Sequence, residues 1–164
     1  MAIKHCKCLS LLLFLAMFSI FLAGIAESRP VNLCGGADYK RLCQKIVKGQ
    51  NSPLGATYEV VHQLISETKR AKRMLSQSAS SKSQAAQICK ENFDDALFDL
   101  HVCITNQNNH DKGSFNSNLS AVVADYVACD DAYTEAGQIS PVDKLNKKLQ
   151  NMADIGLYLE TLVH

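Results

Sequence analysis

Residues 88–104 read ICKENFDDALFDLHVCI, and their apolar positions recur at intervals of three and four residues. These positions are Ile88, Cys89, Phe93, Ala96, Leu97, Leu100, Cys103 and Ile104. An α-helix brings positions at this spacing to one face, whereas a half-buried strand requires strict alternation. The stretch therefore predicts an amphipathic helix with two cysteines on its buried face.

Three other long segments repeat this helical pattern. Their inward positions are Val60, Val61, Leu64, Ile65, Thr68, Ala71 and Leu75, then Leu119, Val122, Val123, Tyr126, Cys129 and Tyr133, and finally Leu145, Leu149, Met152, Ile155, Leu159 and Leu162. A shorter run from Tyr39 to Val47 predicts a short helix that ends near Gly49. The chain therefore predicts four long helices and a short one before them.

Capping signals set the expected boundaries of these helices. The start signals are Ser52 with Pro53, Ser81 with Gln84, and Ser140 with Pro141 and Asp143. Gly137 marks the end of the helix before the last one. The Ser-rich stretch 76–83 interrupts the pattern, and residues 105–118 are polar without an apolar period. We expect residues 105–118 to form the longest surface loop.

The fold class follows from these helices and from the composition. The chain lacks Trp and has only three Pro residues, which suits helices better than a many-turned sandwich. Four long amphipathic helices with short or polar connections bury their apolar faces most simply as an up-down-up-down four-helix bundle. We therefore predict an all-α bundle, with the short first helix as an N-terminal extension.

The first 26 residues have the three parts of a secretory signal peptide. Lys4 and Lys7 precede an apolar stretch from Leu9 to Ala23, and small residues follow. Cleavage is expected before Glu27, which leaves residues 27–164 as one domain outside the membrane. The alternative is a retained membrane anchor, because the apolar stretch approaches the shortest length that spans a bilayer.

Charge and motifs exclude several classes of function. Removing residues 1–26 takes two of the 17 basic residues and none of the 16 acidic ones, so the net charge becomes 15 − 16 = −1. This balance argues against nucleic acid as a partner. His62, His110 and His164 have no zinc-ligand spacing, and no phosphate loop or nucleophile elbow is present. We expect no metal, no cofactor and a binding or inhibitory protein rather than an enzyme.

The five cysteines after the leader are Cys34, Cys43, Cys89, Cys103 and Cys129. In an oxidising compartment they are expected to form structural disulfides. Five cysteines allow fifteen arrangements of two bridges and a thiol, so counting does not decide the connectivity. A bridge between Cys89 and Cys129 would join neighbouring antiparallel helices.

The pattern resembles the plant invertase and pectin methylesterase inhibitor domain. The likeness rests on Cys34 and Cys43 flanking Tyr39 and Leu42, on residues 89–97 (CKENFDDAL), on Leu119-Ser120-Ala121, on Cys129-Asp130-Asp131-Ala132-Tyr133, and on Leu145-Asn146 and Asp154-Ile155-Gly156-Leu157. It covers essentially the whole chain after the leader. The cysteine spacings of nine and forty residues make this set fairly specific.

This resemblance implies a fold, a pairing and a location. It implies a four-helix bundle preceded by a helical hairpin, with bridges Cys34–Cys43 and Cys89–Cys129. Cys103 would then be a free thiol, expected as a small buried hydrophobe, with an intermolecular bridge as the alternative. Family members bind pectin methylesterase or acid invertase and block its active site. Secretion to the apoplast or cell wall is expected, ahead of the vacuole.

The choice between the two target enzymes depends on short motifs. Better-known invertase inhibitors carry Pro-Lys-Phe in the loop between the third and fourth helices, where this chain reads HDKGSFN at residues 110–116. Many pectin methylesterase inhibitors have Thr immediately before the fourth cysteine, where this chain has Ala128. The chain therefore lacks the short motif of each kind of inhibitor. The placement of its carboxylates favours pectin methylesterase as the target, with acid invertase as the alternative.

The predicted partner contacts are Glu91, Asn92, Asp95 and Asp131. Glu91 and Asp95 stand four residues apart and share a helix face. Asp131 follows Cys129 and lies beside that face if the bridge forms. The alternative is an ordinary solvated helix surface. We further expect acidic pH to favour binding, because protonated carboxylates reduce repulsion between two acidic surfaces.

Asn118-Leu119-Ser120 is a glycosylation sequon, expected at the end of the loop, although Asn118 also suits a helix cap. A different class of function stays open: a secreted helical carrier of an apolar ligand, or a receptor ligand.

Overall fold

The computed structural model describes residues 32–163, so the predicted leader lies outside the described residues. These residues form no strand. They form helices α2 (Lys40–Ile46), α3 (Pro53–Gln77), α4 (Gln84–Asn108), α5 (Lys112–Glu135) and α6 (Asp143–Thr161). The all-α prediction is confirmed.

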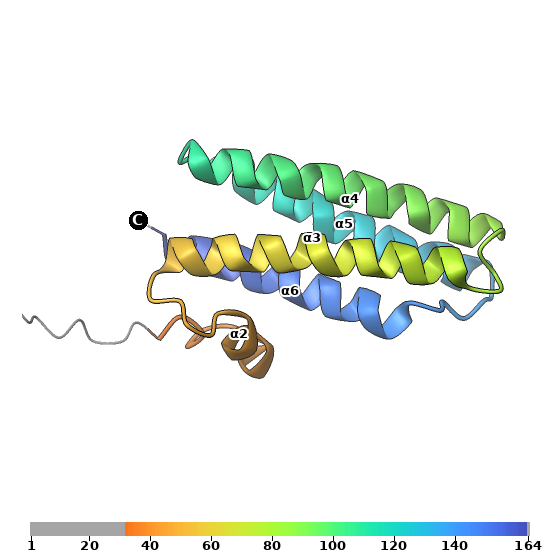
Figure 1. Ribbon diagram of the computed structural model, residues 1–164, viewed down its shortest axis with the longest axis horizontal. Coiled ribbons are helices and arrows are strands. Elements are labelled where there is room, and N and C mark those ends of the chain that lie inside the picture. Colours follow the sequence, from red (N-terminus) through yellow and green to blue (C-terminus); the bar gives the residue numbers. More distant parts are fainter. Residues whose placement is uncertain (1–31, 164) are drawn as a thin grey trace, which may run out of the picture. The chain divides into compact units, whose positions relative to one another are not determined.

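The four long helices form an up-down-up-down bundle (Figure 1). Each helix backbone lies close to its two neighbours, in the order α3, α4, α5, α6 and back to α3. The diagonal pair α3 and α5 meet in the core through a hydrogen bond between the hydroxyls of Thr68 and Tyr126 at 2.6 Å. Short connections force this order, because consecutive helices must turn back beside each other. The largest fully buried side chains are Tyr126, Tyr133, Phe93, Phe115, Leu64, Leu75, Leu100, Leu119, Leu149, Met152, Ile155 and Leu159.

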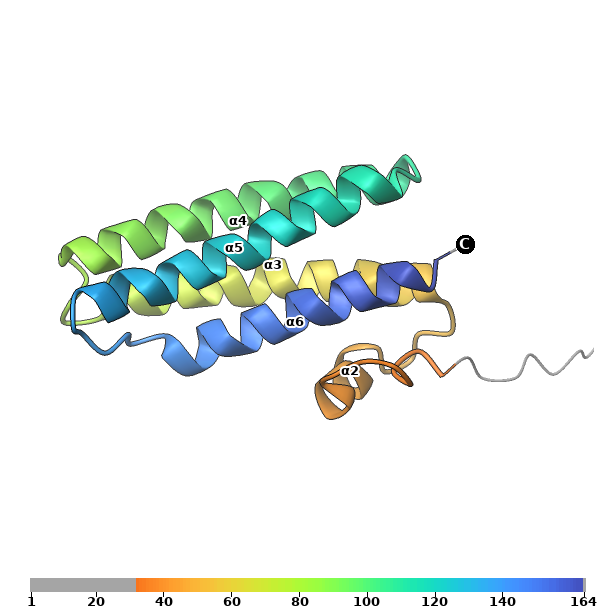
Figure 2. The same cartoon turned by 180° about the vertical axis from the view of Figure 1, so that it is seen from behind.

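Helix α2 packs against α3 and α6 near one end of the bundle (Figure 2). The Cys34–Cys43 bridge ties this helix to the turn before it. The Tyr158 hydroxyl of α6 accepts a hydrogen bond from the Gly36 backbone N–H at 3.0 Å. Of the expected N-terminal hairpin, the described residues contain α2 and the turns that precede it.

Two predicted helix boundaries are confirmed. Ser52 caps α3, since its Oγ accepts from the Gly55 N–H at 3.2 Å, and Pro53 is the first helical residue. Beyond α5, Gly137 has a φ of +61°, and the Gln138 N–H bonds to the Tyr133 carbonyl. This closure needs a left-handed residue, which glycine supplies at little cost.

Two predicted caps are wrong. Ser83, not Ser81, caps α4 by accepting from the Ala86 N–H at 3.2 Å, because the chain remains in turns up to that residue. Ser140 does not cap α6, which begins at Asp143. Its Oγ accepts from the Val142 N–H instead, so the hydroxyl closes a turn before the helix.

The predicted long loop at residues 105–118 is also wrong. α4 continues to Asn108 and α5 begins at Lys112, so three residues connect them. His110, with a φ of +56°, turns the chain after α4, while the Asp111 carboxylate caps α5 by accepting from the Ser114 N–H at 3.0 Å. Polar composition suggested a loop, but helix formation here is supported by packing and a tight capped turn.

Candidate functional site

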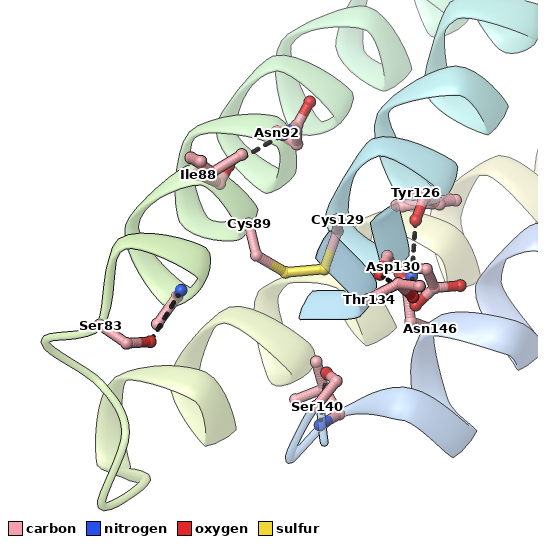
Figure 3. Close-up of a disulfide and its surroundings, with 12 residues drawn as sticks. Ser83, Ile88, Cys89, Asn92, Tyr126, Cys129, Asp130, Thr134, Ser140 and Asn146 are labelled. Atoms are coloured by element: carbon pink, nitrogen blue, oxygen red, sulfur yellow. Dashed lines mark hydrogen bonds between the residues drawn. A yellow bond between two sulfur atoms is a disulfide. The ribbon is translucent and has the colours of Figure 1, made fainter. Parts of the chain in front are cut away.

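Helices α4 and α5 make the most extensive contact in the bundle, and a disulfide joins them. The Cys89–Cys129 bridge has a Cα–Cα distance of 4.2 Å, and both cysteines are fully buried (Figure 3). A covalent link prevents the two antiparallel helices from sliding past each other. Side chains near the bridge are therefore held in a fixed arrangement across both helices.

The α4–α5 pair is strongly acidic. Its basic residues are Lys90 and Lys112, and its acidic residues are Glu91, Asp94, Asp95, Asp99, Asp125, Asp130, Asp131 and Glu135. The Lys90 Nζ donates to the Ser81 carbonyl at 2.7 Å, and the Lys112 Nζ donates to the Val163 carbonyl at 2.8 Å. The pair is therefore acidic overall, and several of its carboxylates are exposed to solvent.

The residues predicted as partner contacts have different surroundings. Glu91, Asp95 and Asp131 are exposed. Asn92 is half-buried, and its Nδ2 donates to the Ile88 carbonyl of the same helix at 2.9 Å (Figure 3). The three carboxylates are therefore available to a partner, whereas the Asn92 amide is held by its own helix.

Asp95 belongs to a carboxylate cluster that sequence reasoning missed. Burial, together with the charges of Asp95 and Asp99, raises the pKa of Asp125 from its ordinary 3.8 to about 6. Burial also raises the pKa of Asp99, with a contribution from Asp95. The spacing of Asp95 and Asp99, four residues apart on one helix, was visible in the sequence. The contribution of Asp125 from α5 depends on the packing of the two helices.

The turn between α4 and α5 is the region that the invertase alternative would use. Phe115 is fully buried in the core, and the Lys112 ammonium is bonded to the Val163 carbonyl at the end of the described chain. A cavity of about 250 Å³ lies beside these residues. The lysine and the phenylalanine of this region therefore serve the fold of the chain itself.

A family comparison identifies the chain. Residues 30–159 match the family model described as plant invertase/pectin methylesterase inhibitor. This chain belongs to that family. Its members are inhibitors, so the chain is an enzyme inhibitor rather than an enzyme.

Two solved structures have a fold similar to that of this chain. A mutant form of a pectin methylesterase inhibitor from Arabidopsis matches with a TM-score of 0.69 at 14% identity, covering 80% of this chain and 95% of that one. A pectin methylesterase inhibitor from Arabidopsis thaliana matches with a TM-score of 0.64 at 14% identity, covering 85% and 99%. No curated protein matches this chain by sequence.

Two further predicted sites of this inhibitor have defined surroundings. Cys103 is a free, fully buried thiol, and burial raises its pKa to about 12, which suppresses the reactive thiolate. Asn118 lies inside α5 rather than at a loop end, and its Nδ2 donates to the Ser114 carbonyl at 2.8 Å. Its glycosylation stays a prediction.

Residues 32–163 contain no cluster of His, Cys, Asp and Glu that would hold a metal ion. No helix in that range has the length and hydropathy needed to cross a membrane.

The raised pKa of Asp125 predicts a pH-dependent stability. The folded state takes up this proton more readily than the unfolded chain, so the associated stabilisation is lost as pH rises from about 4 to about 6. Asp125→Asn mimics the protonated acid. The free energy of unfolding of the variant is expected to equal that of the parent protein near pH 4 and to exceed it at pH 7.

Urea unfolding at both pH values measures this difference. Asp131→Asn is the matched control, because it removes an exposed carboxylate from the same helix. If Asp125→Asn raised the free energy of unfolding equally at pH 4 and pH 7, the raised pKa of Asp125 would be contradicted.

Proposed function

We propose that this inhibitor, secreted after removal of residues 1–26, binds a plant pectin methylesterase and blocks its active-site cleft. The observation that carries the proposal is the exposed acidic surface of Glu91, Asp95 and Asp131 on two helices joined by a buried disulfide. A rigid surface loses little conformational freedom on binding, which favours a stable complex. Family membership and the likeness to two pectin methylesterase inhibitors support the same class of target.

Acid invertase is the alternative target, and the α4–α5 turn does not favour it. An inhibitor that acts through a Lys-Phe pair in this turn needs both side chains free. Here Phe115 is fully buried and Lys112 is bonded to Val163. These contacts support the carboxylate surface as the region that meets the enzyme.

The carboxylate surface also predicts how inhibition depends on pH. Asp125 and Asp99 have raised pKa values, to which the charge of the exposed Asp95 contributes, so proton uptake in mildly acidic solution reduces the negative charge of this region. Lower charge reduces repulsion from an acidic enzyme surface. Inhibition is therefore expected to weaken as pH rises from 5 to 7.5.

Inhibition assays with the oxidised protein, residues 27–164, test the proposal. The protein is assayed in parallel against a plant pectin methylesterase and an acid invertase across that pH range. Loss of methylesterase activity alone supports the proposed target, and loss of invertase activity alone overturns it.

The double variant Asp95→Asn/Asp131→Asn tests the surface. It is expected to flatten the pH dependence of inhibition, because the charge of Asp95 helps to raise the pKa values of Asp99 and Asp125. Removing two negative charges is also expected to tighten binding by up to about tenfold at pH 7.5. Asp143→Asn on α6 is the control, because it removes an exposed carboxylate from a different helix. An unchanged pH profile in the double variant would place the interface elsewhere.

A further inference from the structure

Basic residues gather on a different part of the bundle from the acidic surface. Residues 69–73 of α3 read KRAKR, and only Ala71 of these five is buried. Lys69, Arg70 and Arg73 are exposed. The charge of this nearly neutral protein is therefore separated into a basic stretch on α3 and an acidic surface on α4 and α5.

Ion pairs neutralise some of these cations but not others. Arg70 pairs with Glu67 of the same helix at 3.2 Å, and Lys72 pairs with Asp94 of α4. Within residues 32–163, Lys69 and Arg73 have no carboxylate in salt-bridge distance. They stand four residues apart and so share one face of α3. Two adjacent cations are left for an external anion.

A groove of about 400 Å³ lies beside these two cations. It is lined by Lys69, Lys72, Arg73, Ser76 and Gln77 of α3 and by Leu97 of α4. The lining combines positive charges with a hydroxyl, an amide and an aliphatic side chain. Such a surface matches a sugar chain that carries carboxylates, because sugars present hydroxyls, C–H faces and, in uronates, one carboxylate per residue.

The groove and the acidic surface lie on different sides of α4. Asp94 bonds to Lys72 of α3, whereas the neighbouring Asp95 acts on Asp125 of α5. Consecutive helical residues point about 100° apart, which explains the separation. A ligand in the groove therefore leaves the carboxylates of the acidic surface uncovered.

We propose that this groove binds an anionic polyuronate chain of the kind that a pectin methylesterase leaves as its product. The identity of the chain rests on the proposed function, since hydrolysis of the methyl esters of pectin exposes carboxylates. The groove holds the inhibitor on de-esterified polymer, close to the enzyme that generates it. Nucleic acid fits less well, because the groove has no aromatic side chain on which a base would stack.

Binding to immobilised polygalacturonate, measured without enzyme, tests this proposal. The oxidised protein, residues 27–164, is expected to bind at 50 mM NaCl and to lose roughly tenfold in affinity at 500 mM NaCl, because exposed charges are screened. Fully methyl-esterified pectin of similar length is the neutral comparison and is expected to bind poorly. Equal binding to both polymers, or no binding to polygalacturonate at low salt, would overturn the proposal.

Charge reversal identifies the surface responsible. Lys69→Glu/Arg73→Glu is expected to weaken polygalacturonate binding by more than about tenfold. Lys144→Glu/Lys147→Glu on α6 is the matched control, with the same change in net charge at exposed positions. Circular dichroism melting checks that both variants fold. Equal losses in the two double variants, or tighter binding of the parent protein to anionic lipid vesicles than to polygalacturonate, would overturn the assignment.

These measurements separate this proposal from the proposed inhibitory function. Polygalacturonate binding without methylesterase inhibition would support the groove and reject the inhibitory target. Inhibition without polygalacturonate binding would reject the groove alone.

Discussion

Replacing both Cys89 and Cys129 by alanine is expected to lower the free energy of unfolding by about 4 kcal/mol. The bridge closes a loop of 40 residues, and releasing it restores conformational freedom to the unfolded chain. Domains of this size are commonly stable by 5–15 kcal/mol, so this loss is a large share of the total. Inhibition is expected to weaken as well, because the disulfide no longer fixes the position of α4 relative to α5.

Urea unfolding of the oxidised protein at pH 7 measures this effect. The pair Cys34→Ala/Cys43→Ala opens a loop of only nine residues and is expected to cost about 2.5 kcal/mol. Cys103→Ala is the control for removing a buried sulfur without breaking a bridge. A loss for the Cys89 and Cys129 pair no larger than for the Cys103 control would contradict the role of the bridge.

Replacing Asn146 by alanine is expected to cost about 3 kcal/mol, from lost packing and lost hydrogen bonds to a carboxylate. This side chain of α6 is fully buried. Its Nδ2 donates to the Tyr126 carbonyl at 2.6 Å and to the Asp130 Oδ1 at 2.7 Å (Figure 3). The other Asp130 oxygen accepts from Gln150 at 2.6 Å, so one amide helps to hold α5 and α6 together.

A second substitution separates the hydrogen bonds from the packing. Asn146→Asp keeps the side-chain volume but removes the donor and faces Asp130 with another carboxyl group. It is expected to destabilise the protein at pH 7 at least as much as alanine does. Asn151→Ala, half-buried on the same helix, is the control and is expected to cost less than about 1 kcal/mol. A mild effect of Asn146→Asp in urea unfolding would show that the donor contributes little.

Sequence patterns were most informative where a helix has one buried face. The apolar spacing predicted all four bundle helices, and Ser52 with Pro53 predicted the start of α3, because these signals act over one or two helical turns. The predicted loop at residues 105–118 was wrong, because the polar composition there belongs to helix ends and a tight turn. Asn106 and Gln107 are in fact buried beside the cavity at the end of α4.

Some features of the candidate site also follow from the sequence, whereas others depend on how the helices pack. The shared face of Glu91 and Asp95 is a property of one helix and follows from their spacing. The effect of Asp95 and Asp99 on Asp125 requires α5 to pack beside α4, and the pairing of Lys72 with Asp94 requires α3 on the other side.

The amino-acid sequence by itself determined the helical class, the apolar face of each helix and the presence of cysteines able to join them. These features depend on residues a few positions apart, where helical geometry sets the neighbours. Tertiary structure alone decided which carboxylates are exposed, which cations are paired and that Phe115 belongs to the core. Such properties depend on distances between helices, and those distances are set by how the whole bundle packs.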